Sequence, residues 1–146
     1  MPIKEKLMTE ETFEISDLFT KEQEDNGVWY EPEVRGRPFG IKFKVIGNES
    51  AEGSVIINAL MKELDKIKSM EDNAEKADKE RQITARYISK LVKDMEATRE
   101  GVLLYGNPIR YNQDNVYDIF YNALYICNDV YTFARRSTNF IKEKKS

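Results

Sequence analysis

The sequence predicts an α+β fold in which an N-terminal β-hairpin packs on a mostly helical body of about four helices. Apolar and charged residues alternate over residues 41–45, which is typical of a strand with one buried face. Several later stretches place apolar residues three and four positions apart, which is typical of amphipathic helices. Because 146 residues is the usual size of one domain, we expect residues 1–146 to form a single unit.

The first residues are expected to form a loose arm, a short helix and a turn. Residues 1–8 show no periodic pattern and are expected to be the arm. Thr9 is a suitable N-cap, and two acidic residues follow it in what would be the first helical turn. The polar run 21–27 ends in Asn-Gly, which indicates a turn. The helix would carry one apolar face made of Ile15, Leu18 and Phe19.

Two strands are expected next. The aromatic run 28–30 is rich in β-forming residues, and two glycines and a proline in residues 36–40 indicate a connecting loop. The simplest arrangement is an antiparallel hairpin that pairs residues 28–32 with residues 40–46. Two strands alone are marginal in water, so the hairpin must lie on a helix or pair with another chain. The alternation buries Ile41, Phe43 and Val45 and places Lys42 and Lys44 in water.

The middle of the chain predicts one bent helix or two separate helices. Ser50 or Ser54 can cap a helix that runs to about Met70. The charged stretch 68–82 is either a solvated helical arm or the turn between two helices, and we favour a break near Asp72-Asn73. The apolar face then resumes with Ile83, Tyr87, Ile88, Leu91, Val92 and Met95.

Two further helices are expected after a short extended segment. Residues 102–105 predict either a short third strand or a buried loop. Asn112 can cap a helix over residues 113–122. The last helix is expected from about Ala123 to Asn139, and a basic tail follows over residues 141–146. The apolar side of the helix after Asn112 holds Val116, Ile119 and Phe120.

Charge is unevenly distributed along a chain whose net charge is −3. Residues 1–33 carry ten acidic side chains against three lysines, a net of −7. Residues 135–146 carry five basic side chains against one acidic, a net of +4. Such ends favour homo-oligomer formation or docking on a charged partner, although two solvated ends without a role would give the same pattern.

The sequence predicts a protein that is made and kept in a cytoplasm. A single cysteine excludes an internal disulfide and fits a reducing compartment. Lys4 and Lys6 are not followed by the apolar core of a signal peptide. No apolar run approaches the roughly 18 residues that a membrane span needs. We therefore expect no membrane partner.

The residue types that most catalysis needs are missing. The chain has no histidine, which removes the commonest general base and metal ligand. Cys127 lies in an aromatic helical segment and is expected to be a buried, inert thiol. The glycines match no nucleotide-binding loop, and the acidic residues lack EF-hand spacing. We expect no enzymatic activity, cofactor or metal ion, although a glycosidase-like carboxylate pair is not excluded.

Nucleic acid is not an expected partner, because the sequence pI is about 5.2 and nucleic-acid modules usually carry a basic excess. Candidate protein-binding residues are found at both ends of the chain. Aromatic and arginine side chains are enriched at interfaces, although the core of the hairpin is the expected place for Trp29, and Phe140 would suit the core as well as an interface. The candidates are Trp29, Tyr30, Arg135, Arg136 and Phe140.

Two blocks of the sequence resemble a known family. The first runs from Leu18-Phe19-Thr20 through Gly27-Val28-Trp29-Tyr30 to the strand segment 39–50. The second includes residues 109–115 and 130–140. These blocks resemble small proteins from the tail-gene cluster of tailed bacteriophages, which are regarded as tail assembly chaperones. The resemblance transfers no functional residue.

The resemblance implies a protein that binds the tape-measure protein, the tail-tube protein or both while the virion tail is assembled. A long helical tape-measure protein exposes apolar faces until the tube encloses it, and a chaperone would cover them. Adaptable methionines suit such contacts, and Met61, Met70 and Met95 are candidates, although core positions would explain them as well. The alternative is a structural minor tail or connector protein that is retained in the virion as a ring or homo-oligomer.

Overall fold

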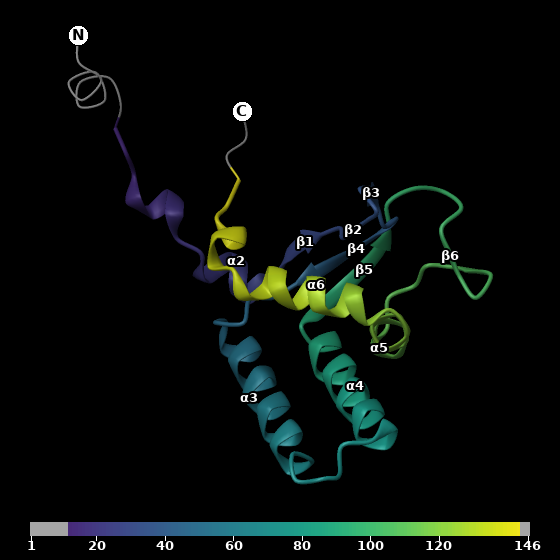
Figure 1. Ribbon diagram of the computed structural model, residues 1–146. Coiled ribbons are helices and arrows are strands. Elements are labelled where there is room, and N and C mark those ends of the chain that lie inside the picture. The colour runs from purple at the N-terminus through teal and green to yellow at the C-terminus, as the bar shows by residue number, and fades with distance from the viewer. Residues whose placement is uncertain (1–11, 144–146) are drawn as a thin grey trace.

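The computed structural model describes residues 12–143 as an α+β fold, in which a small antiparallel sheet packs on helices (Figure 1). The sequence-based fold class is thus confirmed, with five α-helices in the described part of the chain where about four were expected. Residues 1–8, the expected loose arm, lie outside the described residues, as do the last three residues of the basic tail.

The described elements comprise seven short strands, five α-helices and two 3₁₀ turns. The strands are β1 (Val28–Tyr30), β2 (Glu33–Val34), β3 (Arg37–Pro38), β4 (Ile41–Val45), β5 (Val92–Ala97), β6 (Leu103–Leu104) and β7 (Asn107–Pro108). The helices are α2 (Lys21–Asn26), α3 (Ala51–Lys66), α4 (Ala74–Ser89), α5 (Gln113–Asn122) and α6 (Leu124–Arg135). The 3₁₀ turns are η1 (Ile15–Leu18) and η2 (Ser137–Phe140).

The predicted pairing of β1 with β4 is confirmed, with Trp29 opposite Lys44 and Tyr30 opposite Phe43. The alternation of β4 is confirmed too, because its three apolar residues are buried while both lysines lie half-exposed on the other face. The loop between these strands holds a second small hairpin, β2–β3. Its two central residues, Arg35 and Gly36, both have positive φ (54° and 76°), as the commonest tight hairpin turn requires.

The sheet has a third strand that the sequence pattern hid. Residues 91–95 were expected to continue a helix, but α4 ends at Ser89 and β5 pairs with β4 instead. The ladder shifts register between Lys44 and Val45, so Phe43 faces Met95 while Val45 faces Val92. This bulge puts the two buried residues of β5 three positions apart, which mimics helical spacing.

Helices α3 and α4 form an antiparallel hairpin that extends away from the sheet (Figure 1). Ser50 caps α3, with its Oγ accepting from the Gly53 amide at 2.9 Å. Asn73 caps α4, with its Oδ1 accepting from the Lys76 amide at 3.0 Å. The predicted break near Asp72-Asn73 is therefore confirmed, and the charged stretch supplies the turn and the first part of α4.

The N-terminal part of the described chain differs from the prediction in two ways. Residues 15–18 form only the single turn η1, and no apolar face is buried there. The polar run after it forms helix α2, which Gly27 ends at a φ of 92°. Glu24 holds this helix to the body, because it is buried, accepts a hydrogen bond from Thr20 Oγ1 at 2.8 Å and its carbonyl accepts from the Gly47 amide.

The C-terminal helices were largely predicted. Asn112 caps α5 through a 2.7 Å bond from the Asn115 amide, and the three expected apolar residues of α5 are all buried. Helix α6 ends at Arg135 instead of Asn139, and η2 follows it. Residues 102–105 contribute to a separate hairpin, β6–β7, so they do not extend the main sheet.

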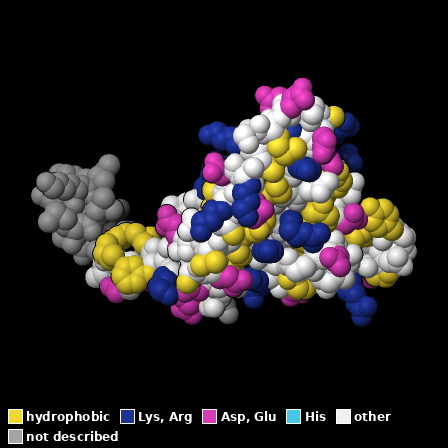
Figure 2. All heavy atoms as spheres, turned by 90° about the horizontal axis from the view of Figure 1, so that it is seen from below, with side chains coloured by type: hydrophobic (Ala, Val, Ile, Leu, Met, Phe, Trp, Pro, Cys, Tyr) yellow, Lys and Arg dark blue, Asp and Glu magenta, His cyan; other side chains and the backbone are white. Residues whose placement is uncertain are grey.

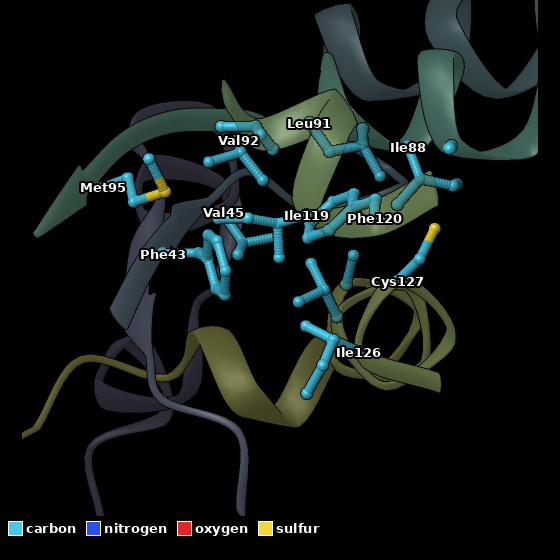
Figure 3. Close-up of a cluster of buried hydrophobic side chains, with 14 of the residues drawn as sticks. Phe43, Val45, Ile88, Leu91, Val92, Met95, Ile119, Phe120, Ile126 and Cys127 are labelled. Atoms are coloured by element: carbon cyan, nitrogen blue, oxygen red, sulfur yellow. The ribbon is translucent and has the colours of Figure 1, made fainter. Parts of the chain in front are cut away.

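One continuous apolar cluster joins the sheet to the helices. In Figure 3 side chains from β4 and β5 face those of α4, α5 and α6. Phe43 packs on Phe120 with ring centroids 5.4 Å apart, and Tyr30 stacks on Phe133 at 4.3 Å. Within residues 12–143, the structure contains no helix with both the length and the apolar character that a membrane crossing requires.

Candidate protein-binding surface

Trp29 lies on the face of the sheet opposite the apolar core. Its neighbour on β4 is Lys44, and the Lys42 ammonium lies 4.6 Å from the centroid of the indole ring. Lys42 also pairs with Glu96 at 3.5 Å. Trp29 is half-buried, so its ring is covered in part by these charged side chains and still offers surface to a partner.

The main contacts of Tyr30 connect strand β1 to helix α6. Its hydroxyl donates to both carboxylate oxygens of Asp129 at 2.9 Å, and its ring stacks on Phe133. Burial and the neighbouring Asp129 carboxylate raise the pKa of Tyr30 to about 12. The contact joins β1 to α6, and because Tyr30 is only half-buried, part of it remains accessible.

The two arginines at the end of α6 lie in different surroundings. The Arg135 guanidinium lies 4.7 Å from the centroid of the Tyr131 ring, a distance typical of a cation–π contact. Arg136 lines a hollow of about 300 Å³ together with Tyr30, Asp129 and Asn139. Both arginine side chains are exposed.

Phe140 lies in the interior, because none of its surface is exposed. Its ring packs on Phe133 at 5.6 Å, and η2 folds it back onto α6. Of the two interpretations that the sequence left open, the structure favours the core position. A partner would reach Phe140 only if η2 moved.

The structure brings three of the five candidates together where the N-terminal strand meets the C-terminal segment. A hollow of about 440 Å³, the terminal hollow, borders Trp29, and Asn139 lines both this hollow and the one that Tyr30 and Arg136 line. Arg135 lines neither of them. The part of the terminal hollow with apolar and basic character consists of Val28, Trp29, Lys44, Ile141 and Lys142.

The largest group of exposed apolar side chains lies elsewhere, on residues 12–20, the apolar arm. Phe13 is 72% exposed, Ile15 59%, Leu18 46% and Phe19 67%. The arm projects from the body beyond α2 (Figure 1), and Figure 2 shows hydrophobic side chains grouped on this projection. Contiguous exposed apolar surface of this kind marks interaction sites.

Sequence reasoning missed the arm because it placed Ile15, Leu18 and Phe19 on the apolar face of a short helix. Their helical spacing was real, but the element is one 3₁₀ turn with two backbone hydrogen bonds. The Asp17 amide donates to the Glu14 carbonyl and the Phe19 amide donates to the Ser16 carbonyl, each at 3.1 Å. A turn this short presents no continuous face. The usable signal was the polar α2 segment directly after it, which separates these residues from the core.

Smaller exposed apolar groups occur at three other places. Leu103 and Tyr105 lie at the β6–β7 hairpin, Tyr125 lies on α6, and α3 exposes Val55 and Met61. Of the three candidate methionines, Met95 is in the core, Met70 is half-buried, and only Met61 is half-exposed.

The described residues were searched for a metal site and for a reactive thiol. Between residues 12 and 143, no three histidine, cysteine, aspartate or glutamate side chains gather as a metal ion would require. Cys127 is fully buried, and burial raises its thiol pKa to about 12. The thiol is therefore protonated and shielded at neutral pH, as the sequence predicted.

Comparisons with family models, with curated proteins and with solved structures found no match to this chain.

Proposed function

We propose that this chain is a phage tail assembly chaperone, a non-enzymatic protein that binds the tape-measure protein, the tail-tube protein or both in the host cytoplasm. The single observation that supports binding is the apolar arm, which exposes Phe13, Ile15, Leu18 and Phe19 on a segment outside the core. The sequence resemblance to tail assembly chaperones supports the choice of partner.

The arm suits a transient chaperone contact. Its aromatic and aliphatic side chains offer apolar area that a helical client can match with its own unburied face. Two acidic residues, Glu14 and Asp17, lie between them and no basic residue does. This composition keeps the arm hydrated while it is free and favours a partner with basic residues beside its apolar face.

The binding proposal is tested with purified proteins. We expect isothermal titration of the chain with fragments of the tape-measure protein from the same phage to give a micromolar or tighter dissociation constant. The double substitution Phe13→Ser and Phe19→Ser should weaken binding at least tenfold, because it removes the two most apolar contacts. The matched control is Leu103→Ser with Tyr105→Ser, which alters two residues outside the arm that are 56% and 74% exposed. Equal binding by both double variants would refute a role for the arm.

A second measurement separates the chaperone from the structural alternative. Quantitative mass spectrometry compares the abundance of the chain in infected cells with its abundance in purified virions. High abundance in cells and absence from the particle support a chaperone that leaves after assembly. Stoichiometric presence in virions would instead favour a minor tail or connector protein.

A further inference from the structure

A single residue in extended conformation separates the turn of the apolar arm from helix α2. Residues 15–18 form η1, Thr20 lies in the right-handed helical region, and Lys21–Asn26 form α2. Phe19 has a φ of −69° and a ψ of 139°. That φ already suits an α-helix, so rotation of ψ at this one residue is the main change that would join the two elements.

The starts of both elements favour such a junction. Among residues 12–143, the side chain of Thr20 makes no capping hydrogen bond to α2, and the side chain of Glu14 makes none to η1. In one continuous helix, the amides of residues 21–23 would donate to the carbonyls of residues 17–19. Residues 12–26 include no proline or glycine, and growth from an existing helix avoids the cost of nucleation.

A continuous helix would gather apolar residues of the arm on one side. Because an α-helix turns by about 100° per residue, Ile15, Leu18 and Phe19 fall within about 100° of one another and form an apolar stripe. The stripe is in line with Glu22 on the exposed side of α2. The buried Glu24 lies roughly 170° from the centre of the stripe. The closed helix would therefore present the stripe away from the core.

The stripe residues have only partial cover in the free chain. Phe19 borders a hollow of about 690 Å³ at the root of the arm, and Lys142 and Glu143 of the C-terminal segment line the same hollow. Ile15 is nonetheless 59% exposed and Leu18 46%. A short helix gains most of its stability from the packing of its apolar face. A partner that covers the stripe would supply this packing and favour the closed helix.

The stripe defines the chemistry of its partner. Large apolar side chains within two helical turns fit an apolar groove between helices. The exposed Glu22 lies one turn after Leu18, so a basic side chain at the end of the groove would pair with it and fix the direction of the helix. We propose that η1 and α2 close into one helix over residues 15–26, whose stripe enters an apolar groove of the helical client with Glu22 against a basic side chain.

The first experiment follows Phe19 by nuclear magnetic resonance in the isotope-labelled full chain. We expect its backbone chemical shifts to be those of an extended residue in the free chain. They should become those of a helical residue when a fragment of the tape-measure protein from the same phage is bound. A nuclear Overhauser contact between Leu18 and Lys21, which crosses the junction, should appear in the same titration. A complex in which Phe19 stays extended overturns the proposal.

Two phenylalanines of the arm provide a matched pair of variants. Phe13 is 72% exposed and Phe19 67%, yet a closed helix would place Phe13 on the side opposite the stripe. Phe19→Ser should therefore weaken binding of the tape-measure fragment about tenfold or more, and Phe13→Ser less than about threefold. Equal losses would show that the arm binds without forming the helix, and they would overturn the proposal.

The charge at the end of the groove is tested at Glu22. Glu22→Lys should weaken binding about threefold or more at low ionic strength, and less at high ionic strength, where exposed charges are screened. The control is Glu100→Lys, which reverses another exposed acidic side chain away from the arm and should leave the affinity unchanged. Wild-type affinity for Glu22→Lys overturns the basic end of the groove.

A cross-link tests the helix without the client. In Ser16→Cys with Thr20→Cys, a linker that fits positions four apart on a helix closes the junction, and Cys127 does not compete because it is fully buried. The linked chain should keep at least the urea midpoint of its unlinked form and bind the tape-measure fragment about threefold more tightly or better. The same linker on Asn58→Cys with Lys62→Cys, two exposed positions of α3, should not change the affinity. A lower midpoint or weaker binding of the linked chain overturns the proposal.

The closed helix rests on the proposed function, and the two fail in different ways. If the fragment binds while Phe19 stays extended, the closed helix is refuted and the proposed function stands. If no tail protein binds although the linked chain is helical over residues 15–26 and as stable as its unlinked form, the proposed function fails and the closed helix stands.

Discussion

The substitution Gly53→Ala should destabilise the protein, although alanine normally stabilises a helix relative to glycine. Gly53 is buried in the first turn of α3. A Cβ atom there would lie 2.0 Å from the Gly47 carbonyl oxygen and 2.7 Å from Ser50 Oγ. The nearest obstacle is backbone, which cannot rotate away as a side chain can.

Three contributions set the expected magnitude. Helix propensity favours alanine by about 1 kcal/mol. The clash costs roughly 1–3 kcal/mol, as overpacking of a buried site does. It also disturbs the cap in which Ser50 Oγ donates to Gly47 O at 2.6 Å and accepts from Gly53 N, and loss of such a cap costs about 1 kcal/mol. The net expectation is a loss of about 2 kcal/mol in the free energy of unfolding.

Urea unfolding followed by far-ultraviolet circular dichroism measures this loss. The matched control is Asn58→Ala at an exposed position of the same helix, where propensity alone applies and stability should rise by roughly 0.5 kcal/mol. If Gly53→Ala is as stable as the wild type, then the close approach of α3 to the β4–α3 loop is wrong.

Three further outcomes are expected. Tyr30→Phe should lower the free energy of unfolding by about 1 kcal/mol at neutral pH, because the hydrogen bond to Asp129 is lost. Since the pKa of Tyr30 is raised to about 12, this hydrogen bond should stop stabilising the wild type as the pH rises from about 10 to about 12. The urea midpoint of the variant should therefore fall less steeply with pH in that range than the midpoint of the wild type. Gln113→Ala should cost about 1–2 kcal/mol in the same assay, because its amide donates to the Ser89 and Val92 carbonyls at 3.1 Å. Cys127 should react with a thiol reagent at about pH 8 only after unfolding; rapid reaction of the native protein would contradict its burial.

Elements with local signals could be predicted from the sequence. Ser50, Asn73 and Asn112 each cap a helix where a polar residue precedes an apolar pattern, because the cap depends on neighbouring residues alone. The period-two pattern of β4 was equally local. These parts of the fold follow from short-range chemistry.

Elements that depend on distant residues could not be predicted. Strand β5 is identified only by its partner β4, and the bulge between Lys44 and Val45 gives it helical spacing. Helix α2 has no apolar face of its own and depends on the contact of Glu24 with Gly47, more than twenty positions away. In both segments, tertiary contacts override the local pattern.

The candidate binding residues show the same limit of sequence-based prediction, because the exposure of a side chain depends on tertiary contacts. The sequence favoured the core of the hairpin for Trp29 and left Phe140 open between core and interface, yet Trp29 lies beside Lys42 at an open sheet face and Phe140 is fully buried. Which aromatic side chain is covered depends on how η2 folds back onto α6, and the local residues do not encode this.

The position of the arm separates folding from binding. The apolar cluster is formed by residues after α2, so the arm contributes apolar surface without contributing to the core. Substitutions of Phe13 or Phe19 should therefore change association while leaving the free energy of unfolding of the monomer within about 0.5 kcal/mol. Substitutions at Tyr30 change both, because that side chain packs on α6 as well as bordering a hollow. Variants of the arm therefore remove the interaction while leaving the fold intact, so they are the decisive reagents for testing the proposed function.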